Sequence, residues 1–177
     1  MIVQVQEPFE NSDWNYGKNG FGHTAITLTK IGVNGLSVTQ TFGFYPAGTG
    51  TGKFIGPSKI VDNSVNDPIN FTIQMNFELG SNNQNFDRIV NYVFNPPSIY
   101  ELMGMNCTYF VIEACKAGGI SLPSAWPNVA GFMDPLNAIN VMTPAGLAQS
   151  MRQIKNQGDN RIKYNSGKAP SSKGSCN

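Results

Sequence analysis

The sequence predicts an α+β domain in which an antiparallel β-sheet packs against a helix that carries a cysteine. Two periodicities favour this class. Apolar and polar residues alternate in the stretches before Phe77, as in half-buried strands, and apolar residues recur at helical spacing after Ser81. Because the two patterns occupy separate parts of the chain, we expect an antiparallel sheet rather than a parallel sheet with crossover helices.

Composition limits the classes of protein that this chain can belong to. The 177 residues carry a net charge of +1 and only 13% are charged, which argues against nucleic acid or anionic membrane as a partner. No apolar run approaches the ~20 residues of a membrane span, and no signal peptide is visible at the N-terminus. We expect residues 1–156 to form one domain and residues 157–177 to form a polar, flexible tail.

Five stretches have the composition of strands. They are Ile2–Gln6, Thr24–Ile31, Leu36–Tyr45, Lys59–Val61 and Asn70–Phe77. Asn34-Gly35 is typical of a two-residue type I′ turn, so the second and third stretches should form a hairpin. The Gly- and Thr-rich segment that follows lacks the lysine of a phosphate-binding loop and is expected to be a surface turn.

Three later stretches have the composition of helices. They are Ser81–Phe94, which Pro96 and Pro97 end, Cys107–Lys116, and Ala145–Lys155 with Pro144 at its first position. Between the last two lies an irregular covering segment, Ser124–Thr143, which we expect Trp126 and Phe132 to anchor.

The second of these helices should begin at Cys107. Asn106 is a good N-cap, and Gly118-Gly119 ends the helix. Apolar residues on several sides predict that the helix is mostly buried. In the first helical turn, unpaired N–H groups and the helix dipole favour a thiolate, so Cys107 is the candidate nucleophile.

The chain contains a single histidine, His23, which is therefore the candidate base. It opens the strand Thr24–Ile31, and a base at a strand end facing a cysteine at a helix start is a recurrent arrangement in cysteine hydrolases. The alternative is that His23 is a structural histidine and Cys107 an inert core thiol. The residue types alone leave both open.

Other residues allow more than one interpretation. Trp14 and Tyr16, in the loop before His23, could line a substrate cleft or pin that loop to the core. Three cysteines are too few for a disulfide framework. If one disulfide forms, Cys115 and Cys176 are the pair that would leave Cys107 free. We expect no metal ion and no other cofactor.

With these motifs placed, the chain resembles circularly permuted papain-like cysteine hydrolases, which are relatives of the NlpC-type cell-wall amidases. It is also similar to the cysteine-hydrolase domains at the C-termini of Rhs-type and other polymorphic bacterial toxins. The resemblance spans Ile2 to Arg152 and rests on the segments VQVQEP, GHTAITL, TFGFYP, NCTYFVIEACKAGGISLP and TPAGLAQSMR.

The resemblance implies roles for individual residues. Cys107 would be the nucleophile and His23 its base, while the backbone N–H of Cys107 and the side chain of Asn106 would hold the oxyanion. A third group usually orients the imidazole from the strand after the histidine, where this chain offers Thr39, Gln40 and Thr41. Gln40 would lie ~20 Å from His23 along the strand, so the third member stays unassigned.

The function that the resemblance implies is a cysteine amidase or peptidase that cuts peptidoglycan peptides or another bacterial peptide. Such a toxin would be an exported effector acting in the periplasm of the target cell, and its producer would carry an immunity protein. Two alternatives remain. One is a lipid acyl hydrolase or acyltransferase of the same fold, and the other is a catalytically silent binding module.

Overall fold

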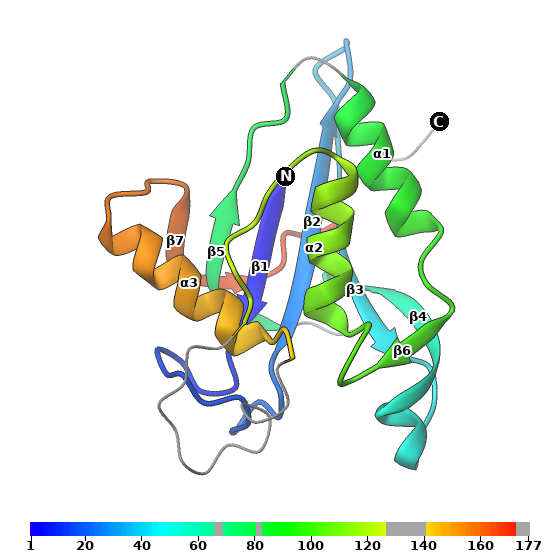
Figure 1. Ribbon diagram of the computed structural model, residues 1–177. Coiled ribbons are helices and arrows are strands. Elements are labelled where there is room, and N and C mark those ends of the chain that lie inside the picture. The colour runs from blue at the N-terminus through cyan, green and yellow to red at the C-terminus, as the bar shows by residue number, and fades with distance from the viewer. Residues whose placement is uncertain (66–68, 81–82, 127–140, 173–177) are drawn as a thin grey trace.

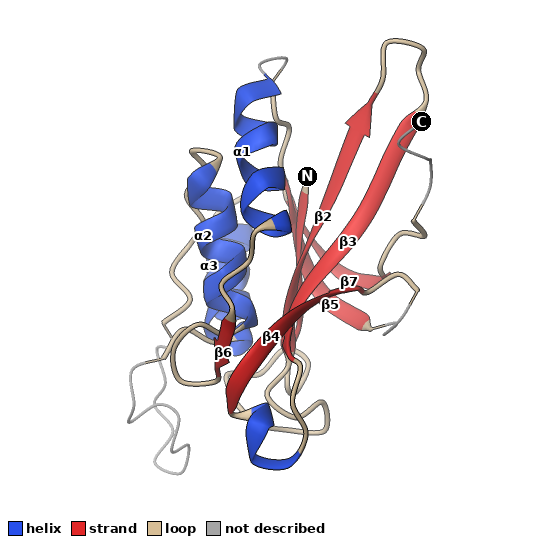
Figure 2. Ribbon diagram, turned by 90° about the vertical axis from the view of Figure 1, so that its right-hand side faces the viewer, coloured by secondary structure: helices blue, strands red, loops and turns tan. Residues whose placement is uncertain are grey.

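The computed structural model describes residues 1–65, 69–80, 83–126 and 141–172. They form two layers, an antiparallel sheet and a layer of three helices on one of its faces (Figure 2). The predicted α+β class with an antiparallel sheet against the cysteine helix is confirmed. No helix within the described ranges is both long and apolar enough to cross a membrane.

The sheet has seven strands in the order β6-β4-β3-β2-β1-β5-β7, and every neighbouring pair is antiparallel (Figure 1). The strands are β1 (Ile2–Gln6), β2 (His23–Ile31), β3 (Ser37–Pro46), β4 (Ile55–Asp62), β5 (Asn70–Asn76), β6 (Ile99–Glu101) and β7 (Ile162–Lys168). A short 3-10 helix, η1 (Gly50–Lys53), lies between β3 and β4.

The three helices are α1 (Asn83–Phe94), α2 (Cys107–Ala117) and α3 (Pro144–Asn156). Each lies close to its predicted position. Thr143 caps α3 by accepting a hydrogen bond from the N–H of Gly146. On the helix-facing side of the sheet, the ring of Phe44 stacks on that of Phe110 of α2 at 4.7 Å, and this pair lies in the middle of the main core.

The hairpin between β2 and β3 forms, but its turn is longer than predicted. Ile31 pairs with Ser37, so the connection has five residues rather than two. Gly35 adopts φ +76°, and the side chain of Asn34 accepts a hydrogen bond from the N–H of Leu36. The Asn-Gly signal therefore marks the turn correctly, while the pairing is offset by one residue.

The expectation of a flexible tail outside the fold is wrong for part of residues 157–177. Within that segment, β7 pairs with β5 and buries Ile162 completely in the main core. Ile162 is the only buried residue of this edge strand, and the rest of the strand is as polar as a loop. The short strand β6 was also missed. The expected cap Ser81 and anchor Phe132 lie outside the described residues.

A buried ion pair holds the loop before β2 against α3. Arg152 of α3 contacts the carboxylate of Glu7, which is only 1% exposed, and it also donates to Asp13 at 2.8 Å and to the backbone carbonyl of Ser12. The carbonyl of Glu7 in turn accepts from the side chain of Asn19. These contacts fix the chain on its way into β2.

We expect the Arg152→Ala variant to lose about 3 kcal/mol of unfolding free energy, because it leaves the carboxylate of Glu7 buried without its partner. The control is Arg161→Ala, which removes a surface ion pair with Asp159 together with the contact of Arg161 with the Phe77 ring, and it should cost much less. Urea denaturation measures both values. Equal losses of unfolding free energy in the two variants would show that the burial of Glu7 does not increase the contribution of its ion pair to stability.

Candidate active site

Cys107 lies in the first turn of α2, directly against the start of β2. The hydroxyl groups of Thr24 and Thr108 are 2.9 Å apart in a buried hydrogen bond that joins the strand to the helix. The backbone N–H of Thr24 and the side chain of Thr108 lie within hydrogen-bonding reach of the sulfur. The predicted meeting of the helix start with the histidine strand is thus present in the fold.

Asn106 is the N-cap of α2, as predicted. Its Oδ1 accepts hydrogen bonds from the N–H groups of Thr108 and Tyr109, and its Nδ2 donates to the carbonyls of Leu102 and Met142. Because both amide hydrogens are engaged, the side chain cannot also donate to an oxyanion. This arrangement therefore supports the capping role of Asn106 and does not support its expected oxyanion role.

His23 points to the sheet face opposite α2. Successive side chains of a strand point to opposite faces, and Thr24 faces the helix. The imidazole stacks on the ring of Tyr45 with centroids 4.3 Å apart. A Cβ on Gly43 would lie 2.6 Å from His23 Nε2 and would also clash with Asn63 Oδ1, so only a glycine fits beneath this group.

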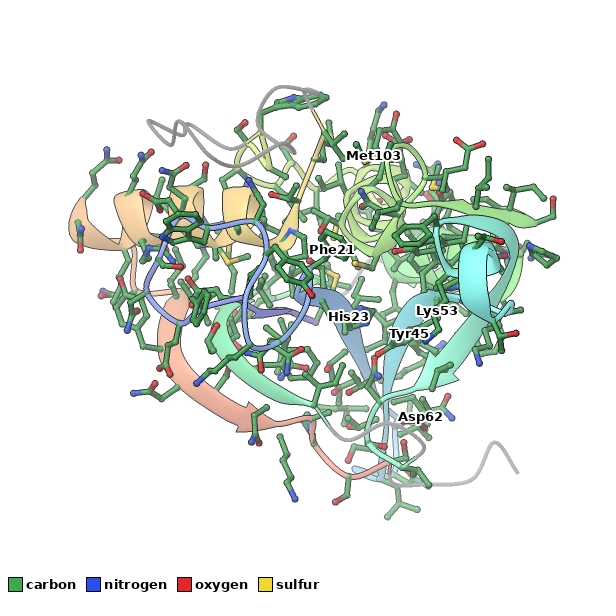
Figure 3. The ribbon with its side chains drawn as sticks, turned by 90° about the horizontal axis from the view of Figure 1, so that it is seen from below. Phe21, His23, Tyr45, Lys53, Asp62 and Met103 are labelled. Atoms are coloured by element: carbon green, nitrogen blue, oxygen red, sulfur yellow. The ribbon has the colours of Figure 1, made fainter. Side chains whose placement is uncertain are left out.

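One pocket nevertheless contacts both predicted catalytic residues. It is open, has a volume of about 460 Å³, and is lined by Cys107 and His23 together with residues of both sheet faces, Phe44 and Tyr45. Figure 3 looks at this end of the sheet from below and shows His23 beside Tyr45. Across the described residues, no hydrogen bond joins the Cys107 sulfur to the imidazole, contrary to the direct contact expected of an activated pair.

Burial dominates the electrostatics of both groups. It lowers the pKa of His23 to about 3, an effect that a hydrogen bond from the imidazole toward Asn63 opposes, although Nε2 has no partner at ordinary hydrogen-bond geometry. Burial also raises the pKa of the Cys107 thiol, more than the nearby N–H groups and hydroxyl lower it. Burial therefore acts against the thiolate expected for Cys107 and favours a neutral thiol and a neutral imidazole in this arrangement.

Asn63 is the candidate third residue that the sequence did not reveal. It follows directly after β4, its backbone N–H donates to the carbonyl of Thr41, and its Nδ2 donates to the hydroxyl of Tyr45 at 2.6 Å. This leaves Oδ1 on the side of the imidazole. Of the β3 residues considered for this role, Thr41 instead bonds Thr27 at 2.7 Å and Thr39 bonds Thr29 at 3.0 Å, whereas Tyr45 of the same strand stacks on the imidazole.

Trp14 and Tyr16 do not line the pockets that contact Cys107 in the described part of the chain, although Tyr16 packs edge-on against Phe21, which lines two of them. Trp14 and Tyr16 are 54% and 61% exposed, so they are not buried anchors, and the pockets that contact Cys107 are lined by their neighbours Asn15 and Phe21 instead. Cys115 is a free, buried thiol, and its suggested partner Cys176 lies outside the described residues. The described residues contain no cluster of side chains suited to a metal ion.

Comparison with known proteins identified no relative of this chain. No family model matches the chain, and no curated protein or solved structure matches it either.

We expect the unfolding free energy to fall as the pH is lowered from 7 to 5. In the unfolded chain His23 takes up a proton below its ordinary pKa of 6.5, whereas in the folded chain it does so only near a pKa of about 3. The predicted loss between pH 7 and pH 5 is about 2 kcal/mol, and the slope reaches its limit of about 1.4 kcal/mol per pH unit only below about pH 5.5. Since the chain has one histidine, His23→Gln should flatten the slope in urea titrations, and an unchanged slope would contradict a buried neutral imidazole.

Alkylation of Cys107 by iodoacetamide should be slow at neutral pH and accelerate as the pH rises, because burial raises the pKa of its thiol. Cys115 should react more slowly still, since burial raises its pKa to about 12. Mass spectrometry of labelled peptides measures both rates. A Cys107 rate that is already at its plateau at neutral pH would reveal an ion pair with His23 that this arrangement lacks.

Proposed function

We propose that the protein is a cysteine hydrolase that cuts an amide bond, with Cys107 as nucleophile, His23 as base and Asn63 as the residue that positions the imidazole. The observation that carries the proposal is the open pocket lined by both Cys107 and the only histidine of the chain. A cysteine at a helix start, a histidine and an amide side chain form a set that recurs in acyl transfer on unrelated folds.

The proposed reaction has two steps. In the first, the Cys107 sulfur attacks the carbonyl carbon while its proton passes to the neutral imidazole of His23. That proton then goes to the leaving amine as the carbon–nitrogen bond breaks, which yields a thioester. In the second, a water molecule attacks the thioester with His23 again as base, which releases the acid and restores the thiol.

Negative charge on the carbonyl oxygen requires a hydrogen-bond donor, and Asn106 does not supply one. The backbone N–H of Cys107 lies beside its own sulfur and is the first donor that we propose. Gln6, which pairs with His23 across β1 and β2, lines the same pocket and offers a side-chain amide as a second. The role that the resemblance implied for Asn106 passes to these groups.

The resemblance to permuted papain-like domains of bacterial toxins guides the choice of substrate. We propose peptidoglycan peptides or a related bacterial peptide, cut by an exported effector in the target periplasm, with an immunity protein as its partner in the producer. Because the pocket beside Cys107 is open to solvent, it suits an extended peptide better than a small molecule that must be enclosed on all sides.

A catalytically silent binding module is the second candidate, and two observations favour it. No hydrogen bond between described atoms connects Cys107 to His23, and the low pKa of the imidazole makes it a weak base in this arrangement. Catalysis therefore requires the imidazole to reach the sulfur when substrate binds, as catalytic hydrogen bonds often tighten only in the substrate complex.

The test is the release of amines from purified peptidoglycan fragments. We expect wild-type protein to release them, Cys107→Ser and His23→Ala to abolish release, and Asn63→Ala to lower kcat/KM at least about tenfold because the imidazole loses its orienting partner. The matched control is Cys115→Ala, which removes the other described thiol of α2 and should retain activity.

The outcomes separate the candidate functions. Cleavage of lipid esters but not of peptides, with the same dependence on Cys107 and His23, would replace the substrate and keep the mechanism. Binding of peptidoglycan fragments without turnover by wild-type and variant proteins alike would favour the binding module.

A further inference from the structure

The charged side chains that line the pocket beside Cys107 are all of one sign. Among the described residues that line it, Lys53 alone carries a formal charge at neutral pH, because the imidazole of His23 is neutral there and no carboxylate lines the wall. The other lining side chains are aromatic, aliphatic or uncharged polar groups. A ligand in this pocket therefore meets a single cation on an otherwise neutral wall.

The backbone around Lys53 is held in place by the neighbouring segments. Lys53 is the last residue of η1, whose turn is closed by the hydrogen bond from the N–H of Phe54 to the carbonyl of Thr51. The carbonyl of Phe54 accepts from the N–H of Leu102, which ties η1 to the segment between β6 and α2. Lys53 itself forms no ion pair with any carboxylate in the described part of the chain.

The position of His23 identifies which part of a substrate would meet Lys53. A general acid must lie within hydrogen-bonding reach of the nitrogen that it protonates, so the leaving amine occupies the space next to the imidazole. A second, smaller pocket also contacts Cys107, but His23 does not line it. The leaving amine thus belongs in the pocket of Lys53, where Figure 3 shows Lys53 beside Tyr45 and His23.

We propose that Lys53 selects substrates whose leaving amine carries a carboxylate close to the scissile bond. This inference rests on the proposed function, since it assigns the leaving group to the side of His23. An ammonium group pairs with a carboxylate as a point charge and does not demand one fixed geometry. The preference should therefore extend to acidic residues of different length, and it should weaken at high salt.

The test uses a pool of random peptides with blocked ends, incubated with wild-type protein, and mass spectrometry of the new N-termini. We expect aspartate and glutamate at the new N-terminus to exceed asparagine and glutamine about fivefold, as for a solvent-reached ion pair. Lys53→Gln should erase this ratio and Lys53→Glu should shift it toward lysine and arginine. The matched control is Lys59→Gln, an exposed lysine of β4 outside the pocket lining, which should keep the wild-type ratio.

A binding experiment keeps the two proposals separate. The inert variant Cys107→Ala and the double variant Cys107→Ala/Lys53→Gln are each titrated calorimetrically with two peptides. One is Ala-Ala-Asp-Ala with an acetylated N-terminus and an amidated C-terminus, and the other is the same peptide with asparagine in place of aspartate. If the aspartate peptide binds more tightly and this difference depends on Lys53, the role of Lys53 is supported. If wild-type protein then cuts no peptide, only the proposed function is contradicted. Equal ratios in wild type and Lys53→Gln, or equal affinities for both peptides, overturn the inference.

Discussion

The hydrogen bond between the hydroxyls of Thr24 and Thr108 is the contact on which the candidate site depends. It joins the first turn of α2 to the start of β2 inside the core, where an unpaired hydroxyl would be costly. Cys107 precedes one of these threonines and His23 precedes the other. The bond therefore brings a thiol and an imidazole that are 84 residues apart in sequence to one end of the sheet.

The same bond explains why the two groups do not touch. By fixing Thr24 toward the helix, it directs His23 to the other sheet face, where Tyr45 and Asn63 surround the imidazole. The stacking and the burial hold the ring neutral and away from the sulfur. In this arrangement the imidazole therefore lies against Tyr45 and Asn63 rather than against the thiol.

Most of the fold could be predicted from the sequence, because strong periodicity and clear end signals mark the central elements, such as Asn106 before α2 and Pro144 at the start of α3. Edge strands were harder. β7 buries little beyond Ile162 and so lacks an alternating pattern. The site was predicted only in part, since Cys107 and His23 are distinctive residue types, whereas Asn63 is one asparagine in a turn whose role arises from tertiary contact. The engagement of Asn106 likewise depends on the carbonyl of Met142, 36 residues away.

The pairing of β7 with β5 bears on how this chain can be synthesised and dissected. β1 lies in the middle of the sheet between β2 and β5, yet β5 and its partner β7 follow it by roughly 70 and 160 positions. Such distant pairings close slowly, because chain entropy is lost before their contacts form. A nascent chain that has left the ribosome only as far as α3 still exposes the apolar side of β5 that Ile162 covers. Until β7 emerges, the edge of β5 stays unpaired, which makes it a site for aggregation and for chaperone binding.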